Sequence, residues 1–376
     1  MSSRLIEGNE AVAWGAHYAG CGFFAGYPIT PATSVFNSML GLLPPTGGTV
    51  LQAEDEIAAI GYCIGASMAG QKAMTATSGP GISLYSENIS FAIGSEIPLV
   101  LVDVQRLGPS TGSATKGADG DIQFLRWGNT AGQPVIVLAP VDVADCFRLT
   151  MEAFNLSERF RCPVFLASNK EVGQTRESVD LEAMDLPRVL DRKMAQEGEG
   201  FRPFAFERED EAPGFLPLGG QTLVRQTSST HGEDGYITAD PEEIDRMQRH
   251  REAKVSAHVD SFAFSEESID PEADLVILSY GVTARSARDA LAWCRSEGKR
   301  VSLLVLKTLW PVPQALIREK TRGAKAVLVA EMNQGQYTPE VERTVPDKEV
   351  RFVGKMNGEL VSPYEIKESV DVWFAQ

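Results

Sequence analysis

The sequence predicts an α/β fold made of two doubly wound domains joined by a long connector. Short β-rich runs alternate with helical periodicity in residues 1–179, this rhythm stops in residues 180–265, and it resumes in residues 266–376. Strands that alternate with helices are typical of a mostly parallel sheet covered on both faces. A chain of 376 residues with 43% hydrophobic content is also long enough to bury two cores.

The first domain is predicted from a regular succession of elements. Strands are expected at residues 23–28, 49–53, 73–77, 98–104, 134–140 and 163–168, and helices at 9–19, from 31, from 56 and at 142–159. Pro31 suits a first helical position, and Thr30 just before it could cap the free amides of that helix. Parallel strands of this kind place the following loops at one edge of the sheet, where α/β proteins bind ligands.

The connector, residues 180–265, is acidic, contains several prolines and has little periodicity. One helix is predicted in it, from Pro241 to about His258, with Asp240 as its cap. A loop of this length is unusual inside a compact domain. We therefore expect the connector to wrap over a neighbouring surface.

The second, smaller domain repeats the α/β rhythm. Strands are expected at residues 274–280, 301–306, 326–332 and 349–354, and helices at 284–296, from 313 and from 363. The last helix has Ser362 as its predicted cap and Pro363 at its first position.

Composition excludes several classes of protein. The net charge of -16 argues against nucleic-acid binding, which depends on clustered Lys and Arg. The five cysteines show no CxxC spacing, which indicates reduced thiols and argues against an iron–sulfur cluster on this chain. No 18-residue apolar run occurs, so we expect a cytoplasmic protein without a membrane span.

Two segments near the start carry candidate functional residues. GYPITPAT (residues 26–33) links a strand to a helix, and Thr30 on spacing alone is more simply a helix cap. In QAEDEIAAIGYCIGASMAG (residues 52–70), three acids precede a helix rich in small residues. Acids in a first turn usually complement the helix dipole, but Glu56 also abuts the apolar run, where its carboxylate would be partly removed from water.

Two further segments follow the next strands. TATSGPG (residues 75–81) is a Gly/Ser turn whose amides could approach an anion, although an ordinary tight turn explains it equally well. VQRLGPSTG (residues 104–112) places Arg106 at the end of a parallel strand. A guanidinium there could grip a carboxylate through two hydrogen bonds, and the alternative is an ordinary loop cation.

Taken together and in this order, GYPITPAT, AEDEIAAIGYCIGASMAG, TATSGPG and QRLGPSTG resemble the alpha subunit of 2-oxoacid:ferredoxin oxidoreductases, particularly the 2-oxoglutarate and 2-oxoisovalerate enzymes. The resemblance continues through HGEDGYIT, SYGVTARSARDA, LKTLWPVP and AEMNQGQ, so it covers nearly the whole chain. It implies that residues 1–179 are a thiamine diphosphate pyrimidine-binding domain and that residues 266–376 resemble the transketolase C-terminal domain.

The resemblance also implies roles for individual residues. The family's catalytic glutamate falls on Glu56, which would hydrogen-bond the aminopyrimidine and promote loss of the thiazolium C2 proton, with Glu54 as the second candidate. The substrate carboxylate would be held by Thr30 and Arg106, and Lys116 is a candidate for a distal carboxylate. The remaining expected cofactor contacts are Pro28, Ile29, Glu54, Ser78 and Gly79. No metal ligand is expected on this chain.

The implied reaction is the oxidative decarboxylation of a 2-oxoacid with coenzyme A to acyl-CoA, carbon dioxide and reduced ferredoxin. The sequence lacks the Gly-Asp-Gly and trailing Asn pair that bind Mg²⁺ and diphosphate in thiamine enzymes. A beta subunit is therefore expected to supply that motif and the [4Fe-4S] cysteines, in an (alpha-beta)₂ or larger assembly that meets ferredoxin; a gamma subunit stays open.

The sequence departs from the family after GPSTG, where Ser113-Ala114-Thr115-Lys116 replaces the usual Pro-Thr-Lys or Pro-Thr-Arg ending. This difference leaves the substrate open between 2-oxoglutarate, which the split arrangement and the chain length favour, and 2-oxoisovalerate or pyruvate. Two other readings also stay open: a non-redox thiamine-dependent decarboxylase or dehydrogenase component, and a non-catalytic scaffold.

Overall fold

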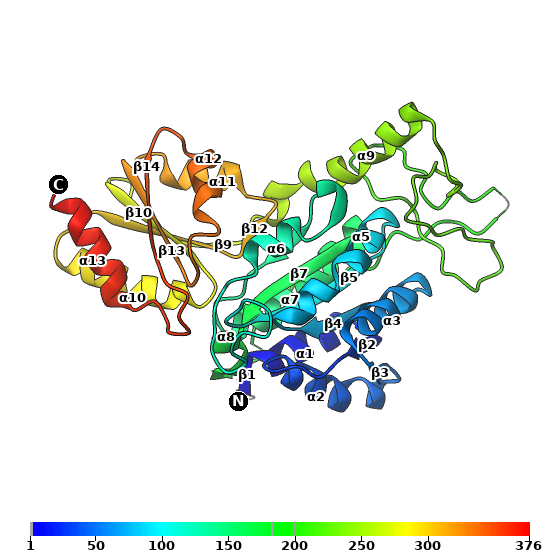
Figure 1. Ribbon diagram of the computed structural model, residues 1–376, viewed down its shortest axis with the longest axis horizontal. Helices are drawn as coiled ribbons and strands as arrows, with labels where there is room; N and C mark the ends of the chain where they lie inside the picture. The colour runs from blue at the N-terminus through cyan, green and yellow to red at the C-terminus, as the bar shows by residue number, and fades with distance from the viewer. Residues whose placement is uncertain (1–2, 182, 199) are drawn as a thin grey trace.

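The computed structural model describes residues 3–181, 183–198 and 200–376. Figure 1 shows two α/β domains side by side, with the connector extending from the first domain on the side away from the second. The predicted fold class is confirmed: the first sheet is almost entirely parallel and carries helices on both faces.

The sheet of the first domain has seven strands in the order β12-β6-β7-β5-β4-β2-β3. Six of them run parallel to their neighbours, and β12 pairs antiparallel with β6. Their bounds are β2 Phe23–Gly26, β3 Thr49–Gln52, β4 Ala73–Thr77, β5 Leu99–Gln105, β6 Ile136–Leu138, β7 Pro163–Asn169 and β12 Thr308–Trp310.

Helices cover both faces of this sheet because the central strands β5 and β7 are buried along their whole length and mostly apolar. One core joins the first face to α1 (Gly8–Tyr18), α2 (Thr33–Leu42) and α7 (Val143–Phe160). The other face packs on α3 (Glu56–Met68) and α5 (Ser86–Gly94), which is preceded by the short α4 (Pro80–Leu84). Smaller elements are β1 (Arg4–Glu7) paired with β8 (Arg176–Val179), α6 (Ile122–Trp127) and α8 (Lys170–Gln174).

The second domain has a five-stranded sheet in the order β14-β13-β10-β11-β9. Its strands are β9 Ser265–Ser268, β10 Leu275–Tyr280, β11 Val301–Leu306, β13 Ala326–Glu331 and β14 Glu349–Gly354, and only β9 is antiparallel. Its helices are α10 Thr283–Ser296, α11 Gln314–Thr321, α12 Thr338–Thr344 and α13 Pro363–Phe374. One hydrophobic core includes residues of both domains, so the two sheets are packed together through side chains.

The connector lies against the first domain, as expected. Buried Arg192 forms an ion pair with Glu158 at 2.7 Å, and Lys254 of α9 (Pro241–Ser256) forms one with Glu96 at 2.6 Å. The predicted cap of α9 is confirmed, since the Asp240 carboxylate accepts from the amides of Glu242 and Glu243. The α9 helix is thus held on the first domain by buried charge pairs.

One local prediction was wrong. The second helix begins at Thr33, not Pro31, and Thr30 does not cap it. The Thr30–Pro31 peptide is cis, and the Thr33 amide donates to the Ile29 carbonyl at 3.0 Å, so Pro31 lies within a turn before the helix. The sequence did not predict β1, β8, β9 or β12, whose short runs (RLIE, RESV, SEES and TLW) pair with strands distant in the chain.

In the described part of the chain, no helix is both long enough and apolar enough to cross a bilayer.

Candidate functional site

The predicted site residues come together at the carboxyl edge of the first sheet. Segments that follow β2, β3, β4 and β5 supply Thr30, Glu56, Ser78 and Arg106, respectively. These strands are neighbours in the sheet, so residues far apart in sequence lie along one edge. This arrangement is the one that parallel α/β sheets use to bind ligands.

The three consecutive acids at the start of α3 have different surroundings. Asp55 caps the helix by accepting from the Ala58 amide at 2.7 Å, and Glu54 is exposed. Glu56, the first helical residue, is only 7% exposed. Among the described residues, no donor is hydrogen-bonded to the Glu56 carboxylate, so its oxygens are available to a ligand.

Gly81 allows Glu56 to approach the end of β4. A methyl group at Gly81 would lie 2.8 Å from Glu56 Oε1 and would collide with Thr77 Oγ1. The hydroxyl of Ser78 is buried and has no hydrogen-bond partner in the described structure. Unpaired buried hydroxyls are costly, which indicates that this corner is arranged for a polar ligand.

Tyr85 forms the floor of this corner. Its hydroxyl lies 2.9 Å from Thr75 Oγ1, and burial raises its pKa well above the ordinary value. Tyr85 therefore stays neutral and adds no charge near Glu56.

Arg106 is held by the backbone of two loops. Its Nη1 donates to the Thr30 carbonyl at 2.6 Å and its Nη2 donates to the Thr111 carbonyl at 2.9 Å. Its Nε is buried without an acceptor in the described residues and faces Gly79, where a Cβ would lie only 2.8 Å away. Gly79 also has a φ of +52°, so a side chain there would be both strained and obstructive.

Arg106 opens into a cavity of about 540 Å³ between the two domains. The first domain contributes Gly79, Pro80, Arg106, Pro109 and Asp121 to its lining, and the second domain contributes Gln334, Gln336 and Met356. Gln336 Nε2 donates to the Gly120 carbonyl at 2.6 Å, which ties the second domain to this wall. The glutamines belong to the run AEMNQGQ, a resemblance signal to which the sequence assigned no role.

Lys116 lies apart from the lining of this cavity. Its side chain is exposed, and its aliphatic stem packs on Gly358, where a Cβ would come within 2.8 Å of Lys116 Cβ. The Leu107 amide donates to the Lys116 carbonyl at 2.8 Å and thereby holds Lys116 beside the Arg106 loop.

Three buried aspartates gather at this cavity: Asp121 lines it, Asp103 and Asp119 do not, and the sequence assigned a role to none of them. Burial raises the pKa of Asp119 to about 7 and that of Asp121 to about 6, and it raises the pKa of Asp103 well above the ordinary value. Asp119 Oδ1 accepts from Asn169 Nδ2 at 2.6 Å. The only sequence signal was an acid inside the apolar run LVLVDV.

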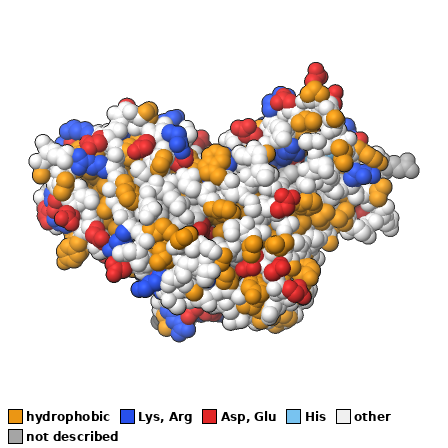
Figure 2. All heavy atoms as spheres, viewed as in Figure 1, with side chains coloured by type: hydrophobic (Ala, Val, Ile, Leu, Met, Phe, Trp, Pro, Cys, Tyr) orange, Lys and Arg blue, Asp and Glu red, His pale blue; other side chains and the backbone are white. Residues whose placement is uncertain are grey.

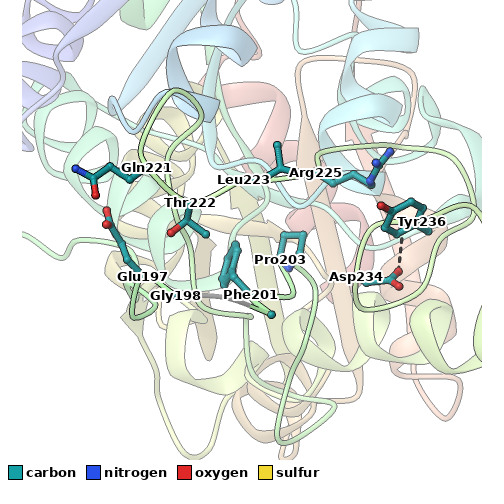
Figure 3. Close-up of a pocket in the computed structure, with 11 residues that line it drawn as sticks. Glu197, Gly198, Phe201, Pro203, Gln221, Thr222, Leu223, Arg225, Asp234 and Tyr236 are labelled. Carbon is teal, nitrogen blue, oxygen red and sulfur yellow. Dashed lines mark hydrogen bonds between the residues drawn. The ribbon is translucent and has the colours of Figure 1, made fainter.

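A second cavity, of about 680 Å³, lies within the connector (Figure 3). Arg225 stacks over the Tyr236 ring at 3.9 Å, and the Tyr236 amide donates to Asp234 Oδ1 at 2.9 Å. Figure 3 shows the labelled side chains on loops. None of the predicted site residues lines this cavity, so the sheet edge is the better candidate site.

Within residues 3–181, 183–198 and 200–376, no group of three or more His, Cys, Asp or Glu side chains could hold a metal ion. The five cysteines are each buried with a free thiol.

Comparison with known proteins identifies the family. Residues 14–250 match the family model described as pyruvate flavodoxin/ferredoxin oxidoreductase, thiamine diphosphate-binding. Residues 273–366 match pyruvate:ferredoxin oxidoreductase core domain II. The chain belongs to the 2-oxoacid:ferredoxin oxidoreductase family. It is accordingly an alpha subunit of a thiamine diphosphate-dependent 2-oxoacid:ferredoxin oxidoreductase, as the sequence predicts.

Relatives of this oxidoreductase subunit agree with the assignment. The chain is 42% identical to the 2-oxoglutarate synthase subunit KorA of Methanocaldococcus jannaschii, over 98% of this chain and 100% of the relative. It is 32% identical to the ketoisovalerate oxidoreductase subunit VorB of Methanothermobacter thermautotrophicus, over 98% of this chain and 97% of the relative.

A solved structure is similar over almost the whole chain. It is the 2-oxoglutarate:ferredoxin oxidoreductase from Magnetococcus marinus with 2-oxoglutarate, coenzyme A and succinyl-CoA bound. The similarity has a TM-score of 0.91 and 32% identity, and it covers 99% of this chain and 65% of that chain.

Proposed function

We propose that this subunit takes part in the oxidation of 2-oxoglutarate with coenzyme A to succinyl-CoA, carbon dioxide and reduced ferredoxin. The observation that carries the proposal is the buried Arg106 guanidinium beside Thr30, at the same sheet edge as Glu56. The higher identity to 2-oxoglutarate synthase subunits than to a ketoisovalerate subunit favours this substrate. Residues 1–179, 180–265 and 266–376 are the proposed pyrimidine-binding domain, connector and transketolase-like domain.

The residues at the sheet edge fit the pyrimidine end of thiamine diphosphate. When bound, this cofactor supplies the carbon nucleophile and the electron sink of the reaction. Glu56 offers a carboxyl group without a protein partner, and the unpaired hydroxyl of Ser78 lies on the neighbouring loop. We assign Pro28, Ile29, Glu54, Ser78 and Gly79 to contacts with the cofactor.

Glu56 is the proposed catalytic residue. Its carboxyl group would share a proton with N1′ of the aminopyrimidine, which needs an acid held at fixed geometry and away from bulk water. The low exposure of Glu56 and the close approach at Gly81 support that role. Glu54 is exposed at the same turn and is the weaker candidate.

Thr30 and Arg106 are proposed to bind the carboxylate next to the 2-oxo group. Because carbonyl oxygens accept from both Nη atoms, the guanidinium is fixed in orientation before substrate arrives. Lys116 is proposed to interact with the distal carboxylate of 2-oxoglutarate, which branched-chain 2-oxoacids lack. Its position beside the Arg106 loop supports this assignment.

A beta subunit is proposed to complete the site with Mg²⁺, the diphosphate contacts and the [4Fe-4S] clusters, in an (alpha-beta)₂ or larger complex. Hydrophobic side chains stand exposed around the Glu56 end, and we call this group the open face: Tyr27, Leu51, Ile57, Tyr62 and Leu84. Figure 2 shows hydrophobic side chains gathered with acidic ones over α2 and α3. An exposed apolar group of this size supports a protein interface at this position.

The function is tested by reduction of a viologen dye by the purified complex, with coenzyme A and each of 2-oxoglutarate, 2-oxoisovalerate and pyruvate. We expect kcat/KM for 2-oxoglutarate to exceed the others by about 10-fold or more. A higher value for 2-oxoisovalerate would overturn the substrate assignment. A colourless partner without iron would overturn the redox assignment and favour a non-redox decarboxylase component, and the same purification shows whether a gamma subunit is present.

A further inference from the structure

We propose that Asp103 and Asp121 share one proton and that this pair takes up a second proton when a carboxylate ligand binds beside Arg106. Asp121 is thus assigned as a positioning residue for the substrate carboxylate. The proposal rests on the proposed role of Arg106 in carboxylate binding.

The two carboxyl groups meet in a buried position. Asp103 lies in the interior strand β5 and is fully buried, and neither of its oxygens receives a hydrogen bond from an amide or hydroxyl of the described residues. Gln105, which shares a face of β5 with Asp103, accepts from the Asp121 amide at 2.9 Å through its Oε1, so Asp121 lies beside Asp103. Asp121 Oδ2 is likewise buried without a partner among the described residues. Two buried carboxyl groups side by side are stable only when a proton lies between them.

The location of that proton follows from the surroundings of each carboxyl. Burial, and then the neighbouring acids, raise the pKa of Asp103 well above the ordinary value. Burial also raises the pKa of Asp121 to about 6, although the neighbouring Asp103 and the charge of Arg106 oppose this effect. Because the Arg106 charge favours the ionised form of Asp121, we assign the retained proton to Asp103 and the change of charge to Asp121.

Other charged and titratable groups face the pair from three elements. Asp119, on the same loop, has a pKa raised by burial to about 7 and is held by Asn169. Arg106 follows β5 and attracts the charge of Asp121. Glu331 of β13 repels Asp119, but both of its oxygens already accept hydrogen bonds.

Asp121 lines the same cavity as Arg106, whereas Asp103 and Asp119 do not. A ligand carboxylate in this cavity adds a negative charge next to Asp121, so it increases the affinity of Asp121 for a proton. By reciprocity, protonation of Asp121 must increase the affinity for the carboxylate. Below about pH 5 the second proton is already present and no uptake occurs. As pH rises from 6 to 8, Asp121 is increasingly ionised before the ligand binds. Binding must then draw the proton from solvent, so the affinity for the ligand carboxylate falls.

The experiment uses the assembled complex and (S)-2-hydroxyglutarate, which carries the carboxylates but no 2-oxo group and so does not react. Calorimetric titration in buffers of different ionisation enthalpy at pH 7 measures the protons taken up. We expect a substantial fraction of one proton in the native complex, and an affinity that falls by about threefold to tenfold from pH 6 to 8.

Two variants separate the members of the pair. Asp121→Asn should abolish uptake and flatten the pH dependence, with affinity at pH 8 no weaker than native. Asp103→Asn should also abolish proton uptake. Its amide would donate to Asp121 and keep it ionised, so the affinity for the ligand should stay low and should not vary with pH. The control is Glu152→Gln on α7, because Glu152 also has a pKa raised by burial but lies in a different helix. It should retain the native uptake.

Native uptake in Asp121→Asn would overturn the proposal, and so would loss of uptake in Asp119→Asn alone. Failure of the underlying function is recognised separately. If Arg106→Lys leaves KM for 2-oxoglutarate unchanged, the proposed role of Arg106 in binding the substrate carboxylate is wrong. If Arg106→Lys raises KM but the aspartate variants behave as native, only the shared-proton proposal fails.

Discussion

The two ends of the sheet edge differ in how completely this chain encloses them. The Arg106 end is closed by the second domain, whose Gln336 and Met356 form the far wall of the cavity. The Glu56 end is bordered by the open face, where Ile57 and Tyr62 are 51% and 43% exposed. We infer that the chain builds its proposed carboxylate-binding half alone and that a partner covers its proposed proton-transfer half.

The largest expected effect is at the open end. Glu56→Gln should lower kcat of the assembled complex by roughly 10²–10⁴-fold, because the amide cannot exchange a proton with the aminopyrimidine. The amide has nearly the same shape, so the complex should still form in gel filtration. If Glu54→Gln causes this loss and Glu56→Gln does not, the two acids have been assigned in the wrong order.

At the closed end, Arg106→Lys should raise KM for every 2-oxoacid by about 10- to 100-fold and change kcat less. A lysine cannot keep both carbonyl contacts and also present two parallel donors to a carboxylate. Steady-state kinetics with 2-oxoglutarate and pyruvate measure the effect. A change confined to one substrate would contradict a grip on the shared carboxylate.

The junction that closes this end depends on Glu331. Its carboxylate accepts from Tyr280 Oη at 2.7 Å, from the Tyr337 and Thr338 amides at 2.9 Å, and from Thr338 Oγ1 at 2.7 Å. Glu331→Gln replaces one acceptor with a donor, so we expect a loss of about 1.5–3 kcal/mol in unfolding free energy. Chemical denaturation tests this, with the exposed Glu342→Gln on α12 as a control that should stay near native.

The smallest effect is expected at Lys116, which lies outside the lining of the cavity. Lys116→Ala should raise KM for 2-oxoglutarate by no more than about fivefold, since Lys116 is exposed and an exposed ion pair contributes only about 0.2–1 kcal/mol. KM for pyruvate should not change, because pyruvate has no distal carboxylate. An equal change for both substrates would show that Lys116 acts on the loop and not on the substrate.

Sequence reasoning succeeded where the determinants are local. The start of α3 at Glu56 and the caps Asp240 and Ser362 depend on residues within one helical turn. The start of α2 was wrong because it is settled by a distant contact: the Thr30 carbonyl is held by Arg106, 76 residues away.

The same distinction separates the parts of the candidate site. Motif order indicated Glu56 and Arg106, since each immediately follows a predicted strand or opens a helix. The position of Asp121 beside Asp103 and the contribution of Gln336 depend on how loops and domains pack, and no spacing in the sequence encodes them. Strand β12 joins β6 across 170 residues for the same reason.

The central claim is that this chain supplies the proton-transfer acid and becomes competent only when the open face is covered. It is tested most directly by hydrogen–deuterium exchange at C2 of thiamine diphosphate, followed by quenched-flow NMR in the assembled complex. We expect fast exchange in the native complex, slow exchange in Glu56→Gln, and slow exchange with the isolated chain. Equally fast exchange in the Glu56→Gln complex would contradict the claim.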